Sequence, residues 1–156
     1  MRFLYTLVLY LASPFVLALL AWRERRRPDG FRHVGERFGY YPSAPQAPII
    51  WVHAVSVGET RAAEPLVRAL QARHPQCRVL LTHMTATGRE TGDTLFGGRV
   101  ERCYLPLDFP GAVARFFDHY RPRAGVIMET EIWPNLIRAG RSRSIPLYLV
   151  NARLSE

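Results

Sequence analysis

Three short polar segments, each directly after an apolar run, hold the residue types best suited to chemistry. They are "SVGET" (56–60), "HMTATGRE" (83–90) and "METEIWPN" (128–135). In the first, Glu59 follows Gly58, a residue without a Cβ that permits a positive φ or the close approach of a ligand. A carboxylate held there can serve as a general base toward a substrate hydroxyl. It can equally cap the following helix and favour its dipole, and the residues alone leave both interpretations open.

The second segment offers hydroxyl groups at the start of a predicted helix. Hydroxyls and free backbone N–H groups at a helix N-terminus form a site for an anion or for sugar hydroxyls. A capping box from Thr87 to Glu90 explains the same residues. The chain has neither a GxxxxGK[ST] phosphate loop nor a GxGxxG motif, so nucleotide binding by these residues is not predicted. The substrate-binding candidates of the first two segments are Ser56, Gly58, Thr85, Thr87 and Gly88.

The third segment places two carboxylates, Glu129 and Glu131, after a strongly apolar run. An acid at the end of a buried strand costs desolvation unless it has a partner, and this cost is commonly met at functional sites. Helix-capping acids beside an arginine are the alternative. Asn151 and Arg153, in "NARLS" (151–155), follow the fifth apolar run and are expected to face the same crevice.

The elements that must position these segments alternate along the chain. Strands are predicted near 49–55, 77–82, 100–105, 124–128 and 145–150, and helices near 61–73, 88–96, 110–120 and 132–142. Near-continuous apolar runs such as "AGVIM" and "IPLYLV" are typical of strands covered on both faces, as in a parallel sheet with crossover helices. The predicted class is α/β, with a Rossmann-like parallel sheet. Ligands of such sheets bind beyond the carboxyl ends of the strands. Pro65 conflicts with an uninterrupted first helix unless it lies in the first turn or at a kink.

The first 22 residues predict a membrane-anchor helix. Phe3 to Trp22 is a stretch of 20 residues without a charge, which as a helix is about 30 Å long, the thickness of a bilayer's hydrocarbon core. Ser13 and Pro14 interrupt it, which a membrane helix tolerates when a hydroxyl satisfies the freed carbonyl. A cleaved signal peptide is disfavoured because "RERRR" (23–27) follows at once, which keeps the rest of the chain cytoplasmic.

Residues 23–48 are predicted to form a basic juxtamembrane segment and a linker. The arginines of this segment should attract the anionic lipids of an inner membrane. "FRHVGERFGYYP" (31–42), basic and aromatic together, suits a segment on the membrane surface, and "PSAPQAP" (42–48) suits a linker. Residues 49–156 then form the α/β domain, which we expect to be incomplete because the chain stops at "NARLSE".

Composition limits the remaining classes of function. The net charge is +8, and all 21 basic residues are arginine. Their clustering beside the apolar stretch, with no nucleic-acid-binding motif, argues against a nucleic-acid partner. Cys77 and Cys103 form no metal-binding or redox motif and are expected to be reduced thiols. Three histidines (His53, His83 and His119) lack metal-ligand spacing, are expected to be structural, and no metal or cofactor is predicted.

The motifs together resemble those of a known family. "VHAVSVGET", "THMTATGRE", "YLPLD" (104–108), "METEIWPN" and "NARLS", in this order and spacing, are similar to the N-terminal half of the Kdo transferases, and "GERFGYYP" (35–42) is similar to their membrane-proximal segment. These bacterial glycosyltransferases move 3-deoxy-D-manno-oct-2-ulosonic acid (Kdo) from CMP-Kdo to a lipid A precursor. The resemblance covers essentially the whole chain. "TATG" in place of the commoner "TPTG" and "EIW" in place of "ELW" are mild departures.

The resemblance implies the acceptor-binding half of a GT-B glycosyltransferase at the cytoplasmic side of the bacterial inner membrane. Glu59 is then the catalytic base and Glu129 an acid that stabilises the transition state. CMP-Kdo, the donor substrate, is bound by a C-terminal domain that this chain lacks, and that domain supplies a stabilising lysine, a residue type absent here. We therefore expect residues 1–156 alone to be inactive.

Other readings of the same residues remain open at this stage. A membrane-tethered, non-catalytic module that binds sugar or lipid would need the same fold without a base. A glycoside hydrolase could use Glu129 and Glu131 as its acid and base. However, two side chains two residues apart in one loop rarely flank a scissile bond from both sides.

Overall fold

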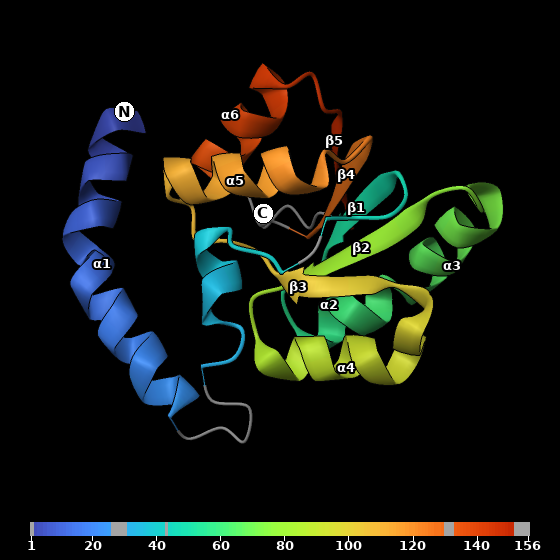
Figure 1. Cartoon of the computed structure of the whole chain (residues 1–156), viewed down its shortest axis with the longest axis horizontal. Coiled ribbons are helices and arrows are strands. Elements are labelled where there is room, and N and C mark those ends of the chain that lie inside the picture. Colours follow the sequence, from blue (N-terminus) through green and yellow to red (C-terminus); the bar gives the residue numbers. More distant parts are fainter. Residues whose placement is uncertain (1, 26–30, 43, 130–132, 152–156) are drawn as a thin grey trace, which may run out of the picture.

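The computed structural model describes residues 2–25, 31–42, 44–129 and 133–151 (Figure 1). Its elements, in chain order, are α1 (Arg2–Glu24), the 3-10 helix η1 (Val34–Phe38), β1 (Ile49–His53), α2 (Val57–Ala62), α3 (Glu64–Arg73), β2 (Arg78–His83), α4 (Ala86–Phe96), the 3-10 turn η2 (Gly97–Arg99), β3 (Glu101–Tyr104), α5 (Pro110–Tyr120), β4 (Ala124–Met128), α6 (Pro134–Ser142) and β5 (Leu147–Val150). The five predicted strands are confirmed, with ends shifted by no more than two residues.

The five strands form one parallel sheet in the order β3-β2-β1-β4-β5. The chain moves outward from β1 through β2 to β3, then returns to the other side of β1 to form β4 and β5. Each connection carries a helix, as parallel pairing requires. The predicted Rossmann-like α/β class is confirmed. This order also creates a switch point between β1 and β4, where ligands of open α/β sheets bind.

Helices cover both faces of the sheet (Figure 1). Side chains alternate between the faces along each strand, so Trp51 packs under α5 while Val52 packs against α3. The α5 side is the more aromatic: Trp51 contacts Phe116 and Phe117 at ring-centroid distances of 5.1 and 5.8 Å. All three rings are fully buried, which is worth roughly 1.5–3 kcal/mol for each side chain.

The predicted helix at 61–73 is two helices in the structure. α2 begins earlier than predicted, at Val57, because Ser56 caps it. It ends at Ala62, and α3 begins at Glu64 with Pro65 in its first turn, where the missing N–H costs no helical hydrogen bond. The conflict that Pro65 raised is therefore resolved by a break in the helix.

Strand β5 departs from the prediction that its apolar run is covered on both faces. Tyr148, Leu149 and Val150 are 57, 44 and 37% exposed. β5 is the last strand of the sheet, and α6, which lies beside it in the chain, contacts it mainly through Leu147. Only the first residue of the strand is thus packed within the described part of the chain.

Helix α1 runs along one side of the domain, with its N-terminal end beside α5 and α6 (Figure 1). Polar contacts to the domain include Asn135 Nδ2 to Thr6 Oγ1 at 3.3 Å, and the Tyr10 ring lies 5.0 Å from that of Phe109. Ser13 Oγ donates to Tyr10 O at 2.6 Å, the carbonyl that Pro14 leaves without a helical donor, as predicted. The stretch Leu4–Trp22 is long and apolar enough to cross a membrane by length and composition.

Candidate functional site

The two predicted catalytic carboxylates follow the two strands that flank the switch point. Glu59 lies two residues into α2, after β1, and Glu129 lies directly after β4. β1 and β4 are paired, with His53 opposite Ile127 at their carboxyl ends. The sheet therefore brings both residues to the same edge, at the point where the strand order reverses. This is the place where the fold class predicts ligand binding.

Glu59 is held by a network that its own segment supplies. Oε2 accepts from the backbone N–H of Val55 at 2.9 Å, and Oε1 accepts from Ser56 Oγ at 3.0 Å. Ser56 Oγ in turn accepts from the Glu59 backbone N–H at 3.4 Å, which makes a reciprocal capping box. The capping interpretation is therefore confirmed. The side chain is 8% exposed, and a carboxylate has about four lone-pair positions, so capping leaves Glu59 acceptor capacity.

The second predicted segment packs directly on the first. Thr85 caps α4 by accepting from the Gly88 N–H at 3.1 Å, so Thr85 rather than Thr87 is the N-cap, and the predicted box from Thr87 to Glu90 is wrong. Thr85 Oγ1 also donates to Val55 O at 3.0 Å. A Cβ on Gly88 would lie 2.9 Å from that same oxygen. Gly88 is thus needed for the approach of the two turns, while Gly58 and Thr87 are exposed at their surface.

Two buried histidines end β1 and β2 beneath these turns. Nδ1 of His83 donates to Ala54 O at 2.8 Å, and Nδ1 of His53 lies 3.1 Å from Thr82 O. Burial lowers the pKa of His53 to about 3 and that of His83 to about 4, so both rings are neutral at pH 7. Both rings are fully buried, which fits the predicted structural role, although Nε2 of each has no hydrogen-bond partner among the described residues. Among the described residues, no group of three or more His, Cys, Asp or Glu side chains could hold a metal ion.

The other side of the switch point is built on unusual backbone. Glu129 and Asn151 both have φ of 59°, in the left-handed region that non-glycine residues seldom adopt. They end the neighbouring strands β4 and β5, and the Glu129 N–H donates to Val150 O at 2.8 Å. Such conformations cost of order 1–3 kcal/mol and cluster at functional sites. Two further predicted site residues, Glu131 and Arg153, lie outside the described residues.

Asp108 organises this side of the site, a role that the sequence analysis did not assign. Its carboxylate accepts from the backbone N–H groups of Asn135 at 3.0 Å and Leu136 at 2.8 Å, and so caps α6. Asp108 is 2% exposed, and burial raises its pKa. The signal available in the sequence was an acid at the end of the apolar run "YLPLD". The helix that it caps begins 26 residues later, at Pro134, which no local pattern reveals.

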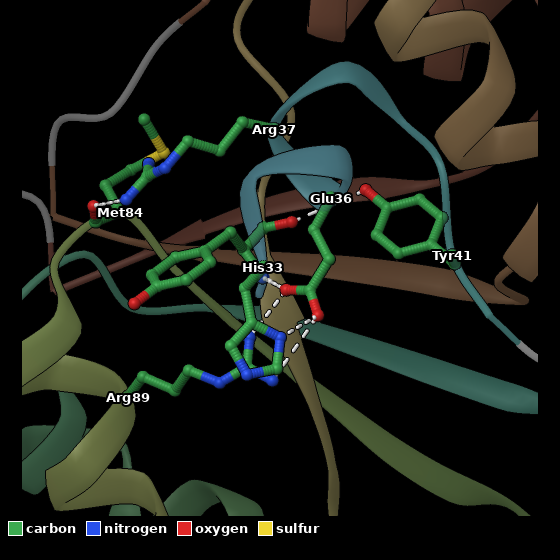
Figure 2. Close-up of polar contacts among 7 residues, drawn as sticks. His33, Glu36, Arg37, Tyr41, Met84 and Arg89 are labelled. Atoms are coloured by element: carbon green, nitrogen blue, oxygen red, sulfur yellow. Dashed lines mark hydrogen bonds and ion pairs between the residues drawn. The ribbon is translucent and has the colours of Figure 1, made fainter. Parts of the chain in front are cut away.

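Glu36 and Arg37 were also missed. They were assigned to a membrane-surface segment, but η1 places both in the domain, where they are 8 and 5% exposed. Figure 2 shows His33 and Arg89 directed at the Glu36 carboxylate and Arg37 reaching Met84. The local sequence gave no signal that Glu36 and Arg37 are buried, because Arg89 and Met84, which they contact, lie far along the chain.

A hollow of about 1110 Å³ lies beside this cluster, along the edge of β3. Three of the arginines that line it are paired with acids: Arg89 with Glu36 at 2.5 Å, Arg78 with Glu101 at 3.7 Å and Arg102 with Asp93 at 2.5 Å. None of the sequence-predicted site residues lines it. We therefore assign the candidate site to the switch point, where the strands that precede Glu59 and Glu129 end side by side, rather than to this hollow.

Comparison with known proteins identifies the family of the chain. Residues 32–156 match the family model described as 3-Deoxy-D-manno-octulosonic-acid transferase (kdotransferase). The chain belongs to the Kdo transferase family. Two relatives carry the name 3-deoxy-D-manno-octulosonic acid transferase: one from Bordetella pertussis is 47% identical over 164 residues, and one from Haemophilus influenzae is 41% identical over 156 residues.

The chain is much shorter than these Kdo transferases. Both alignments cover 99% of the chain, but only 38% of the Bordetella protein and 36% of the Haemophilus protein. The chain thus spans little more than a third of the length of the relatives it matches, and corresponds to their N-terminal part. All of the described site lies within the stretch that the family model matches.

Proposed function

We propose that the full-length protein containing this chain transfers Kdo from CMP-Kdo to the lipid A precursor in lipopolysaccharide biosynthesis. The observation that carries the proposal is membership of the Kdo transferase family across nearly the whole chain. In this proposal the described domain is the acceptor-binding half of a GT-B enzyme. CMP-Kdo binds mainly to a further, C-terminal domain.

Glu59 is the proposed general base. A hydroxyl of a glucosamine unit of the acceptor attacks the anomeric carbon of Kdo, and Glu59 takes the hydroxyl proton as the new C–O bond forms. The bond from that carbon to the phosphate oxygen of CMP breaks, and CMP leaves with the bonding electrons. The capping box supports this role because it fixes the carboxylate on a rigid strand end, which is what a positioned base requires.

The remaining site residues are assigned to binding and electrostatic support. Glu129 is proposed to stabilise the oxocarbenium character of the transition state across the switch point. The turn at 85–88 presents Thr85, Thr87 and Gly88 beside Glu59, and these groups, with Ser56 and Gly58, are proposed to contact acceptor sugar hydroxyls. Glu131, Asn151 and Arg153 complete the proposed substrate contacts.

We also propose that α1 anchors the protein at the cytoplasmic face of the bacterial inner membrane. Large apolar side chains are exposed on α1: Leu4, Leu7, Val8, Leu11, Phe15, Leu17, Leu19 and Trp22. The opposite face, with Thr6, lies toward the domain. One face of the helix is thus available to lipid, and the arginines that follow it in sequence suit anionic headgroups. Such an anchor brings the site to an acceptor whose acyl chains stay in the bilayer.

Product mass tests the proposed reaction. Membranes that carry the full-length protein are incubated with CMP-Kdo and the lipid A precursor, and the lipid is analysed by mass spectrometry. We expect a gain of one or more Kdo units. Retention of the precursor on the protein with no gain in mass would overturn the proposed transfer and favour the non-catalytic binding module. That alternative has one observation in its favour, since capping alone accounts for the position of Glu59.

A further inference from the structure

The turn at 85–88 is proposed above to contact the acceptor and is called the acceptor turn here. It is held at both ends by two consecutive residues of η1, Glu36 and Arg37. Arg89, directly after the turn, donates to the Glu36 carboxylate, with Nη1 2.5 Å from Oε2. Met84, directly before the turn, accepts at its carbonyl oxygen from Arg37 Nη2 at 3.2 Å. A membrane-proximal segment and a substrate turn some 50 residues away in sequence are thus joined at two points (Figure 2).

Glu36 collects three donors from three different segments. Besides Arg89, His33 Nδ1 lies 2.8 Å from Oε1, and the backbone N–H of Tyr104, at the carboxyl end of β3, donates to Oε2 at 2.7 Å. Among the described strands β3 is the last on its side, and this N–H is directed at Glu36. The Glu36 carboxylate therefore accepts hydrogen bonds from the backbone of β3 and from the Arg89 guanidinium at the same time.

The Glu36 carboxylate compensates for an unfavourable position of the Arg89 cation in α4. Arg89 is the fourth residue of α4, near the positive end of the helix dipole, where a cation is disfavoured. It also lies close to the Tyr104 ring, with its guanidinium carbon 5.0 Å from the ring centroid. A buried carboxylate opposite Arg89 offsets this unfavourable placement and fixes the direction in which the side chain leaves the helix.

Arg37 holds the other end of the turn through its planar guanidinium. Its guanidinium carbon lies 4.1 Å from the centroid of the Tyr104 ring while it donates to Met84 O. The side chain is 5% exposed, so solvent screens these contacts little. Lysine cannot reproduce both contacts, because an ammonium group lacks the flat face and the fixed fork of donors.

Helix η1 is itself fixed to the domain, so it can act as a rigid support. The Leu107 N–H donates to Arg37 O at 2.8 Å, and Arg115 Nη2 donates to Phe38 O at 2.7 Å. Gly39 ends the helix with φ of 80°, and a Cβ there would overlap the carbonyl of Ala112. Residues 34–39 are therefore part of the folded domain.

We propose that Glu36 and Arg37 are positioning residues for the acceptor turn. They touch no reacting atom. They set the place and orientation of the turn that carries Thr85 and Gly88, and hence of the acceptor beside Glu59. A role in stability alone is the competing explanation, but buried ion pairs often add little net stability compared with apolar packing. The proposal rests on the proposed transferase function.

Kinetics of the full-length protein in membranes test the proposal. E36Q, R37A and R89Q are each expected to raise the KM for the lipid acceptor about tenfold, which corresponds to about 1.4 kcal/mol. The KM for CMP-Kdo should stay within about twofold of the wild-type value, since the donor binds mainly elsewhere. R37K should fall between R37A and the wild type. A purely structural role would lower the amount of active enzyme without separating the two KM values.

A double-mutant cycle sharpens the test. Because Glu36 and Arg89 act through one contact, E36Q/R89Q should be no worse than either single variant, so the effects should not add. The matched control is the surface pair Glu64 and Arg68 on α3, whose atoms lie 2.6 Å apart; E64Q should leave all constants unchanged.

The outcomes separate this proposal from the one on which it rests. Transfer by the wild type with unchanged acceptor kinetics in E36Q and R37A would overturn the positioning role alone, as would additive effects in the cycle. No transfer by the wild type would overturn the proposed function and the positioning role with it. If E36Q fails to accumulate in membranes, the graded series R37A and R37K decides whether the positioning role holds. Substituting Arg37 leaves the contacts of the Glu36 carboxylate in place.

Discussion

The two sides of the switch point hold their acidic residues in opposite ways. After β1, Glu59 lies in regular helix, and both carboxylate oxygens accept hydrogen bonds from the two residues around the cap. After β4, Glu129 lies on left-handed backbone next to a second such residue, Asn151. One side is therefore fixed by local capping chemistry and the other by backbone that the surrounding sheet must hold in place. A proposed base needs a defined direction, whereas a proposed electrostatic stabiliser needs mainly a defined distance.

The largest expected effect on stability is on the Glu59 side of the switch point. In G88A the new Cβ would lie 2.9 Å from both Thr85 Oγ1 and Val55 O, so the two turns must move apart. We expect a loss of about 2–3 kcal/mol, typical of overpacking against backbone. Denaturant unfolding of the full-length protein measures it. A loss below 0.5 kcal/mol would show that the two turns are not packed as tightly as described. G98A, where a Cβ meets nothing within 4 Å, is the matched control.

The buried histidines beneath these turns predict acid sensitivity. Their folded-state pKa values, about 3 for His53 and about 4 for His83, lie below the unfolded value of 6.5. Between pH 6.5 and 4 the unfolded chain binds more protons, so stability falls on acidification, by up to about 1.4 kcal/mol per pH unit for each ring.

H83N isolates one ring's share of this effect. Its amide can still donate to Ala54 O but does not titrate, so the fall in stability between pH 6.5 and 4 should be clearly shallower than in the wild type. Melting temperatures across this range measure the slope. An unchanged slope would contradict a neutral, buried His83.

Removing the cap should show whether transfer requires the Glu59 carboxylate to be held in one orientation, in addition to being present. In S56A the carboxylate loses the donor at Oε1 and the helix loses its N-cap. We expect a cost of about 1 kcal/mol in stability. We also expect a fall of about tenfold in the transfer rate, since a freed carboxylate points at the acceptor only part of the time. S56T, which keeps the hydroxyl, should restore both. Full activity in S56A would mean that capping does not aim the base.

The smallest effect on stability is expected at Glu129, which lies on left-handed backbone, and it should be a gain and not a loss. Glycine adopts positive φ without the penalty that Glu129 bears, so E129G should raise stability by up to about 1 kcal/mol while it lowers transfer. E129Q, which keeps the backbone strain but not the charge, should lower transfer without the gain in stability. A loss of stability in E129G would show that the carboxylate, rather than the fold around it, maintains this conformation.

Much of this comparison could be predicted from the sequence. Apolar periodicity located all five strands, and the segments after them supplied the candidate site residues Ser56, Gly58, Glu59, Thr85, Thr87, Gly88 and Glu129, whose roles stay predictions. Capping by Glu59 was one of the two interpretations of its segment; its partner Ser56, only three residues away, was not assigned as the N-cap. The break between α2 and α3 was signalled by Pro65 but not assigned.

The remainder depends on contacts between distant residues. Glu36 meets Arg89 and Tyr104 across 53 and 68 positions, so nothing near it in sequence distinguishes it from a solvated acid. Asp108 caps a helix that starts well downstream for the same reason. Strand order, and thus the position of Glu59 and Glu129 after neighbouring strands, also follows only from tertiary packing.

The most direct test of the account is the single-turnover rate of Kdo transfer by the full-length protein and its E59Q variant, with both substrates saturating. The amide keeps an oxygen to accept from Val55 but cannot take a proton. The account predicts a rate at least about 100-fold lower in E59Q, with acceptor affinity retained and with E64Q equal to the wild type. Equal rates in E59Q and the wild type would contradict the assignment of Glu59 as the proton acceptor.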